Sequence, residues 1–89
     1  MQAGGKMENA ISVFIGATSD EKVKTIETVQ QLLKIGGVQK VWELTGSLDL
    51  LVLASSPSVA QLNSVVEAVR ACRGVRSETT YLVLESHSK

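Results

Sequence analysis

The apolar residues of this chain repeat with two different periods, and the order in which these periods follow one another restricts the fold. Residues 10–17 have the two-residue alternation of a strand, whereas residues 18–36 have the three-to-four-residue spacing of a helix. The same succession returns in the second half of the chain. The predicted order of elements is therefore strand, helix, strand, strand, helix, strand.

The first half of the chain carries signals for the ends of its elements. Thr18 and Glu21 have the spacing of a capping box, which predicts that the first helix begins at Thr18. The pair Gly36-Gly37 supplies a left-handed stop, and residues 38–45 are rich in strand-forming side chains. The helical face expected to be buried consists of Val23, Ile26, Val29 or Gln30, and Leu33.

The second half begins with Gly46-Ser47, a pair that predicts a tight hairpin turn. Residues 48–54 follow as a nearly continuous apolar strand. Ser56-Pro57 predicts the start of the second helix, with the serine as its cap, and Gly74 ends that helix before a last strand at residues 75–85. The buried stripe of the second helix is expected to be Val59, Leu62, Val65, Val66, Val69 and Cys72.

Right-handed crossovers in both halves place the two helices on the same face of one sheet. The predicted fold class is thus α+β, a ferredoxin-like βαββαβ arrangement with a four-stranded antiparallel sheet and two helices on one face. We expect a flexible N-terminal segment at residues 1–9, one domain at residues 10–85 and a polar tail at residues 86–89.

Two helices cover only one face of such a sheet, and the other face is expected to be apolar. The strand at residues 48–54 cannot present a polar face in either orientation. A large apolar face exposed to water promotes association. The simplest expectation is a two-fold homodimer that buries this face, with an unidentified different protein as the alternative partner.

The charges of the chain argue against several classes of function. Nine Lys and Arg residues balance nine Asp and Glu residues and are scattered, so direct binding of nucleic acid is not expected. No 18-residue apolar run and no signal peptide are present, so neither a membrane span nor secretion is expected. Cytoplasmic residence is the resulting expectation.

The residues that usually carry catalysis are sparse. The single histidine, His87, lies in the terminal tail, and the single cysteine, Cys72, has no histidine near it in the sequence. No metal-ligand spacing is present. We therefore expect no cofactor and no enzymatic activity.

Asp49 stands out because it lies between Leu48 and Leu50, where a carboxylate needs a polar partner. One interpretation is structural, with Asp49 accepting hydrogen bonds from turn amides beside Gly46. The other is functional: Asp49 pairs with the ammonium group of an amino acid, while the amides around Gly46 and Ser47 bind its carboxylate. Residue chemistry leaves both open.

Two segments of the sequence resemble a known family. Residues 41–51 (VWELTGSLDLL) resemble the signature hairpin of the effector domain, or RAM domain, of Lrp/AsnC transcription regulators, with Thr or Ser, Gly, two variable residues, Asp and a hydrophobic run. Residues 74–84 (GVRSETTYLVL) resemble the last strand of that domain, in which a Gly-Val pair leads into a Thr and a hydrophobic run. The resemblance extends over residues 10–85.

This resemblance implies a regulatory module that forms dimers through its sheet, assembles further, commonly into octamers, and binds an amino-acid effector at contacts between dimers. The ligand-binding residues that it implies are Thr45, Gly46, Ser47, Asp49, Thr79 and Thr80.

The sequence departs from the family in two respects. Glu78 stands where many members have a threonine, so the altered charge would favour a basic effector or abolish binding. Only a few polar residues precede the first strand, where family regulators carry a DNA-binding domain. The resemblance therefore implies a stand-alone module that modulates transcription indirectly, for instance by assembling with a full-length Lrp/AsnC regulator.

Two other interpretations compete with this one. The chain could be a pure assembly domain that binds no ligand, or a small dimeric enzyme with a ferredoxin-like fold. The enzyme would need acid–base groups that converge in a deep cavity, and the sequence offers few.

Overall fold

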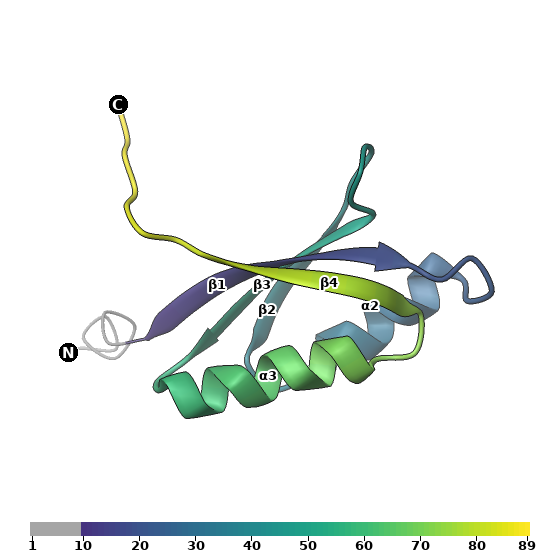
Figure 1. Ribbon diagram of the computed structural model, residues 1–89, viewed down its shortest axis with the longest axis horizontal. Helices are drawn as coiled ribbons and strands as arrows, with labels where there is room; N and C mark the ends of the chain where they lie inside the picture. The colour runs from purple at the N-terminus through teal and green to yellow at the C-terminus, as the bar shows by residue number, and fades with distance from the viewer. Residues whose placement is uncertain (1–9) are drawn as a thin grey trace.

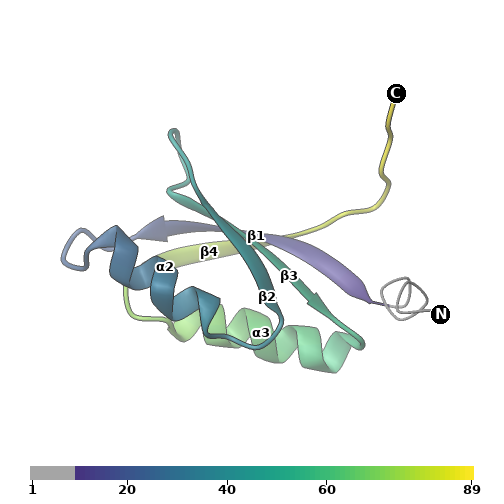
Figure 2. The ribbon, with the colours of Figure 1, turned by 180° about the vertical axis from the view of Figure 1, so that it is seen from behind.

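A computed structural model describes residues 10–89, and the expected flexible N-terminal segment, residues 1–9, lies outside the described residues. The elements are β1 (Ile11–Ser19), α2 (Thr25–Leu33), β2 (Val38–Glu43), β3 (Leu50–Ser56), α3 (Val59–Ala71) and β4 (Val75–Leu82). The strands form one antiparallel sheet in the order β2-β3-β1-β4. Both helices lie on the same side of this sheet (Figures 1 and 2). The predicted ferredoxin-like α+β fold is confirmed.

The core lies between the sheet and the two helices. Alternate residues of β1, namely Val13, Ile15 and Ala17, are buried against the helices, and Leu50, Val52 and Ala54 of the neighbouring β3 point the same way. The buried face of α3 consists of Leu62, Val65 and Val69. This face of α3 agrees with the predicted stripe, except that Val59 is 66% exposed and Val66 and Cys72 are only partly buried.

The first helix begins later than the capping-box pattern predicted. Thr18 is part of β1, where its hydroxyl group forms a hydrogen bond with the hydroxyl of Ser77 in β4. The chain then turns at Asp20, whose carboxylate accepts a hydrogen bond of 2.9 Å from the Lys22 amide. The prediction of a helix start at Thr18 is wrong because pairing with β4 extends β1 to Ser19.

The buried face of α2 also differs from the prediction. Ile26 and Leu33 are 55% and 52% exposed, whereas Thr28 and Leu32 are completely buried. Of the expected face, Val29 packs against the core. The side of α2 that carries Thr28 and Leu32 faces the sheet instead. The apolar pattern alone therefore did not determine which side of the helix is buried.

The start of α3 is shifted by two residues from the prediction. Ser58, not Ser56, caps the helix, and its hydroxyl oxygen accepts a hydrogen bond of 3.2 Å from the Gln61 amide. Ser56 is a buried residue of β3 that pairs with Ile11 of β1. Pairing with β1 therefore extends β3 through the position that the sequence suggested as the cap.

The connection between β2 and β3 is a six-residue loop, residues 44–49, which projects from the sheet (Figure 1). It is closed by a hydrogen bond of 2.9 Å from the Leu44 amide to the Asp49 carbonyl. The predicted two-residue turn at Gly46-Ser47 is wrong. β3 begins at Leu50, two residues later than predicted. The Leu48 side chain instead packs over Gly16, where it lies 2.6 Å from the position that a Cβ atom would take.

The side of the sheet that faces away from the helices carries apolar side chains, and we call it the open face; its larger members are Phe14, Trp42, Leu48, Leu51, Leu53 and Tyr81. The rings of Phe14 and Trp42 lie 6.2 Å apart between centroids, and the ammonium group of Lys40 lies 5.1 Å from the Trp42 ring. An apolar open face agrees with the sequence-based expectation.

The last strand is shorter than predicted, since β4 ends at Leu82 and residues 83–89 form neither helix nor strand. These residues leave the sheet as an extended tail (Figure 1). Leu84 is 88% exposed, so nothing in residues 10–89 covers this apolar side chain.

Gly74 should tolerate substitution poorly. Its φ is +98°, and an added Cβ atom would lie 1.9 Å from the hydroxyl oxygen of the buried Thr28. Left-handed strain and overpacking together should make Gly74→Ala less stable by about 2–5 kcal/mol in urea denaturation.

Gly46→Ala is the matched control, because Gly46 also has a positive φ, +119°, but has open space around it. Removing the obstacle with the double substitution Gly74→Ala/Thr28→Ala should restore part of the stability lost in Gly74→Ala. Equal losses for Gly46→Ala and Gly74→Ala would contradict the predicted clash with Thr28.

Candidate effector-binding site

Asp49 lies at the base of the projecting loop and is anchored to β1. Its Oδ2 atom accepts a hydrogen bond of 2.8 Å from the Ser19 amide, and its own amide donates one of 2.9 Å to the Ala17 carbonyl. The Asp49 carboxylate thus accepts its hydrogen bond from an amide of β1, not from the turn amides beside Gly46. One bond fixes the carboxylate and the other fixes the backbone of Asp49 at the end of the sheet.

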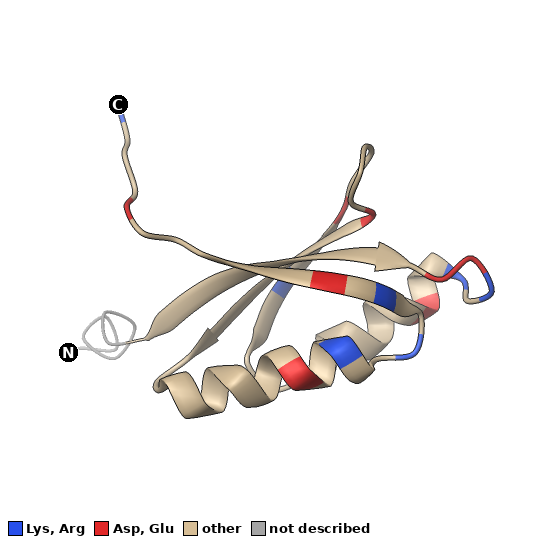
Figure 3. Cartoon of the chain, in the orientation of Figure 1, with Lys and Arg blue, Asp and Glu red and all other residues tan. Residues whose placement is uncertain are grey.

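Around Asp49 the surface is hollowed over a volume of about 580 Å³, and we call this the Asp49 hollow; it is lined by Thr18, Ser19, Glu21, Asp49, Arg76 and Ser77. Three of these residues carry charges and three carry hydroxyl groups. Figure 3 shows acidic and basic residues near one another where β1 ends and β4 begins. Such a lining can bind a small ligand that carries both a positive and a negative group.

The other predicted residues of the loop lie at its tip. Thr45, Gly46 and Ser47 are exposed, and an added Cβ on Gly46 would meet no atom within 4 Å. They do not line the Asp49 hollow. Because these three residues are exposed, a second molecule would have to complete any site there.

The two predicted threonines of β4 lie on opposite faces of the sheet. Thr79 pairs with Gly16 and belongs to the open face, whereas Thr80 pairs with Ile15 and belongs to the helix face. The structure therefore does not bring Thr79 and Thr80 together with Asp49 in one chain. The β4 residues that share a hollow with Asp49 are Arg76 and Ser77.

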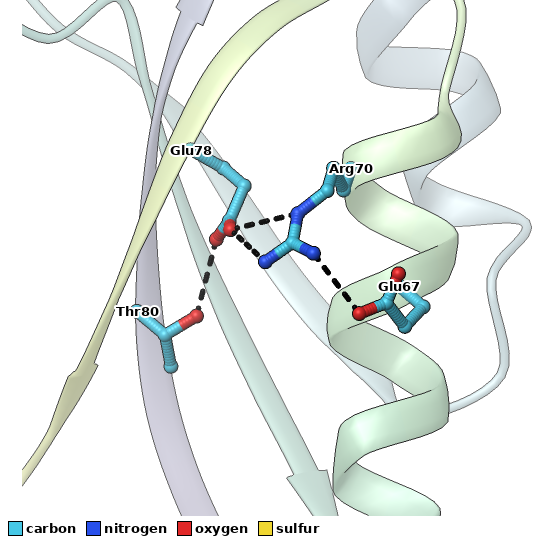
Figure 4. Close-up of polar contacts among 4 residues, drawn as sticks. All are labelled: Glu67, Arg70, Glu78 and Thr80. Atoms are coloured by element: carbon cyan, nitrogen blue, oxygen red, sulfur yellow. Dashed lines mark hydrogen bonds and ion pairs between the residues drawn. The ribbon is translucent and has the colours of Figure 1, made fainter.

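Thr80 is held in a polar network with the helix α3 (Figure 4). Its hydroxyl donates a hydrogen bond of 3.1 Å to Oε2 of Glu78, and Oε1 of Glu78 accepts bonds of 2.7 and 3.2 Å from Arg70. Arg70 also forms an ion pair of 3.0 Å with Glu67. The hydrogen bond from Arg70 to Glu78, together with the charges of Glu67 and Glu78, raises the pKa of Arg70.

This network bears on the departure at Glu78. The Glu78 side chain is only 7% exposed, and the guanidinium group of Arg70 neutralises its charge. Glu78 therefore adds no unpaired negative charge to the surface. From the sequence, Glu78 was expected to favour a basic effector. A basic effector would have to compete with Arg70, which already pairs with this carboxylate.

The two residues weighed for catalysis in the sequence, Cys72 and His87, lie at the C-terminal cap of α3 and in the tail, respectively. Burial raises the pKa of the Cys72 thiol, so it remains protonated at neutral pH, and His87 is exposed in the tail. Among residues 10–89 no three potential metal ligands lie together. In the same part of the chain, no helix has the length and apolar character needed to cross a membrane.

Sequence reasoning missed Glu21, Arg76 and Ser77, together with Thr18 and Ser19, as residues that surround Asp49. Thr18 was expected to cap a helix, and Glu21 to complete its capping box. No local signal placed Arg76 in the hollow, because its position depends on an irregularity in the pairing of β1 with β4. That irregularity is visible only in the folded sheet.

Comparison with known sequences places this fold in a family. The sequence model of the Lrp/AsnC ligand binding domain matches residues 12–89. A homocitrate synthase of Saccharolobus solfataricus is 37% identical over 75 residues, which cover 84% of this chain, and one of Sulfolobus acidocaldarius is 33% identical. The chain spans only 16% of the length of these enzymes.

Solved structures share the fold at lower identity. A Neisseria meningitidis transcriptional regulator in complex with L-Met superposes with a TM-score of 0.81 at 18% identity, covering 100% of this chain and 59% of the regulator. A Thermus thermophilus protein superposes with a TM-score of 0.76 at 20% identity, covering 89% of this chain and 99% of that one. From the match over residues 12–89, the chain belongs to the Lrp/AsnC ligand binding domain family.

Proposed function

We propose that this chain is an oligomeric regulatory module that binds a small effector, an amino acid, at contacts between its copies and thereby controls a partner protein. The observation that carries this proposal is Asp49 at the edge of a hollow, where its carboxylate accepts a hydrogen bond from the Ser19 amide and its own amide donates one to the Ala17 carbonyl. A fixed carboxylate of this kind pairs well with the ammonium group of an amino acid. The relative crystallised with L-Met supports this class of effector.

The position of the predicted residues favours a site shared between copies. Thr45, Gly46 and Ser47 lie exposed at the tip of a projecting loop, where they can reach a neighbouring molecule. Thr79 lies on the open face, whereas Thr80 is engaged with Glu78. We propose that the loop tip of one copy covers an effector bound at Asp49 or near Thr79 of another.

Two kinds of partner fit the similarities. One is a full-length Lrp/AsnC regulator, through which the chain would influence transcription by co-assembly without binding nucleic acid itself. The other is a biosynthetic enzyme, and the 37% identity to a segment of homocitrate synthases favours this second candidate. In either case the chain acts as the regulatory part and performs no catalysis.

The open face is proposed as the contact between two copies. Figure 2 shows that both helices lie on one side of the sheet. The strand registers place the aromatic and aliphatic side chains of the open face on the other side. Burial of such a surface against a second copy removes it from water and gives a two-fold dimer. Dimers of this kind can assemble further, and octamers are the largest assembly that we propose.

Amino-acid binding should be visible as thermal stabilisation of the purified protein. At about 100 times its dissociation constant, a ligand adds roughly 2.7 kcal/mol, which raises the Tm of a domain of this size by about 10 °C or more. Differential scanning fluorimetry with the 20 common amino acids measures this shift.

The substitution Asp49→Asn should abolish the shift, because it removes the charge and retains an oxygen that can accept the Ser19 amide. Glu78→Gln is the control, since Arg70 already neutralises that carboxylate, and its ligand response should remain. A Tm that no amino acid changes, in an otherwise intact oligomer, would favour the pure assembly domain.

The dimer contact should depend on Leu53, which lies on the open face opposite Phe14. Leu53→Lys should weaken dimerisation by at least about 100-fold, because an unpaired ammonium group would be buried. Light scattering at several protein concentrations measures the mass. Leu33→Lys changes an equally apolar but exposed residue of α2 and should leave the mass unchanged.

A further inference from the structure

We propose that Arg76 binds the carboxylate of the effector while Asp49 binds its ammonium group, so that one chain holds the whole polar head of the ligand in the Asp49 hollow. This inference rests on the proposed function and deepens it. It assigns the carboxylate of the ligand to Arg76, whereas the sequence-based interpretation had it bound by the amides around Gly46. It also predicts that a ligand with a free carboxylate binds more tightly than the corresponding amine.

The pairing of β1 with β4 places Arg76 in an unusual position. Thr18 pairs with Ser77, but the next residue of β1, Ser19, pairs with Val75, so Arg76 is an extra residue in a bulge. A bulge redirects the side chain of the extra residue and is common beside binding sites. Here Arg76 lines the Asp49 hollow together with its neighbour Ser77.

The guanidinium group of Arg76 is available to a ligand. Arg70 in α3 differs from Arg76, because its guanidinium group already pairs with Glu67 and Glu78. Arg76, in contrast, forms no ion pair with any of residues 10–89, although Glu21 and Asp49 line the same hollow. A guanidinium group that keeps its donors free can bind a carboxylate through two parallel hydrogen bonds.

The opposite charge of the ligand has a partner in the same hollow. Asp49 uses Oδ2 to accept the Ser19 amide, which leaves Oδ1 without a hydrogen bond from residues 10–89. Glu21 adds a second carboxylate to the lining, and the hydroxyl groups of Thr18 and Ser77 add neutral donors and acceptors. The ammonium group of a bound amino acid can therefore pair with Asp49 or Glu21, while its carboxylate pairs with Arg76.

The hollow has room for a small molecule, at about 580 Å³, but it is open to one side. Three of its six lining residues, Glu21, Arg76 and Ser77, are exposed. The polar head would thus be held by this chain, and the ligand side chain would extend toward whatever covers the hollow. This chain would then recognise the ammonium and carboxylate groups that all amino acids share, and a second copy would distinguish their side chains.

Isothermal titration calorimetry tests the role of Arg76. The titrants are the amino acid that gives the largest Tm shift in the panel of 20 and the amine that lacks only its carboxylate. Arg76→Gln should weaken binding of the amino acid by about 10- to 100-fold, the range expected for losing a charge-assisted pair. Arg73→Gln, a nearby exposed arginine that lines a different hollow, should leave the affinity unchanged.

The amine provides the double-mutant comparison. It should bind the unaltered protein about as weakly as the amino acid binds Arg76→Gln, and Arg76→Gln should not weaken the amine further. Circular dichroism confirms that each variant is folded. Equal affinities of the unaltered protein and Arg76→Gln for the amino acid would overturn this inference alone, whereas an unaltered protein that binds none of the 20 would overturn the proposed function with it.

Discussion

The position of β1 between β3 and β4 determines most of the features described above. Its alternation sends Val13, Ile15 and Ala17 into the core and leaves Phe14 and Gly16 on the open face. A shift of β1 by one residue would turn these apolar side chains from the core to the open face, so burial of the core residues fixes the register. With that register fixed, Asp49 and Ser77 come to opposite sides of the end of β1, and the hollow forms between them.

The sequence predicted the order of the elements well because apolar periodicity and glycine stops are local signals. The face of α3 and the stops at Gly37 and Gly74, both at positive φ, are cases in which local chemistry and the fold agree. The starts of both helices were wrong for one reason. Thr18 and Ser56 have the chemistry of caps, but each is paired as a strand residue with a distant segment, and such pairing outweighs a single capping bond.

The candidate site, too, could be predicted from the sequence only in part. Asp49 could be singled out from its apolar neighbours, and its anchoring to β1 explains how a carboxylate is tolerated there. The two threonines of β4 were chosen by resemblance, yet strand alternation sends Thr79 and Thr80 to opposite faces. Arg76 could not be found from the sequence, because a bulge is a property of two paired strands and leaves no mark in either one.

The absence of a side chain at Gly16 links parts of the molecule that are far apart in sequence. Leu48 from the projecting loop and Tyr81 from the edge strand both approach the space above this residue. A methyl group there would lie 2.6 Å from the end of the Leu48 side chain, which would have to move away from the sheet. The lack of a side chain at Gly16 thus lets the loop residue next to Asp49 pack directly on the backbone of β1.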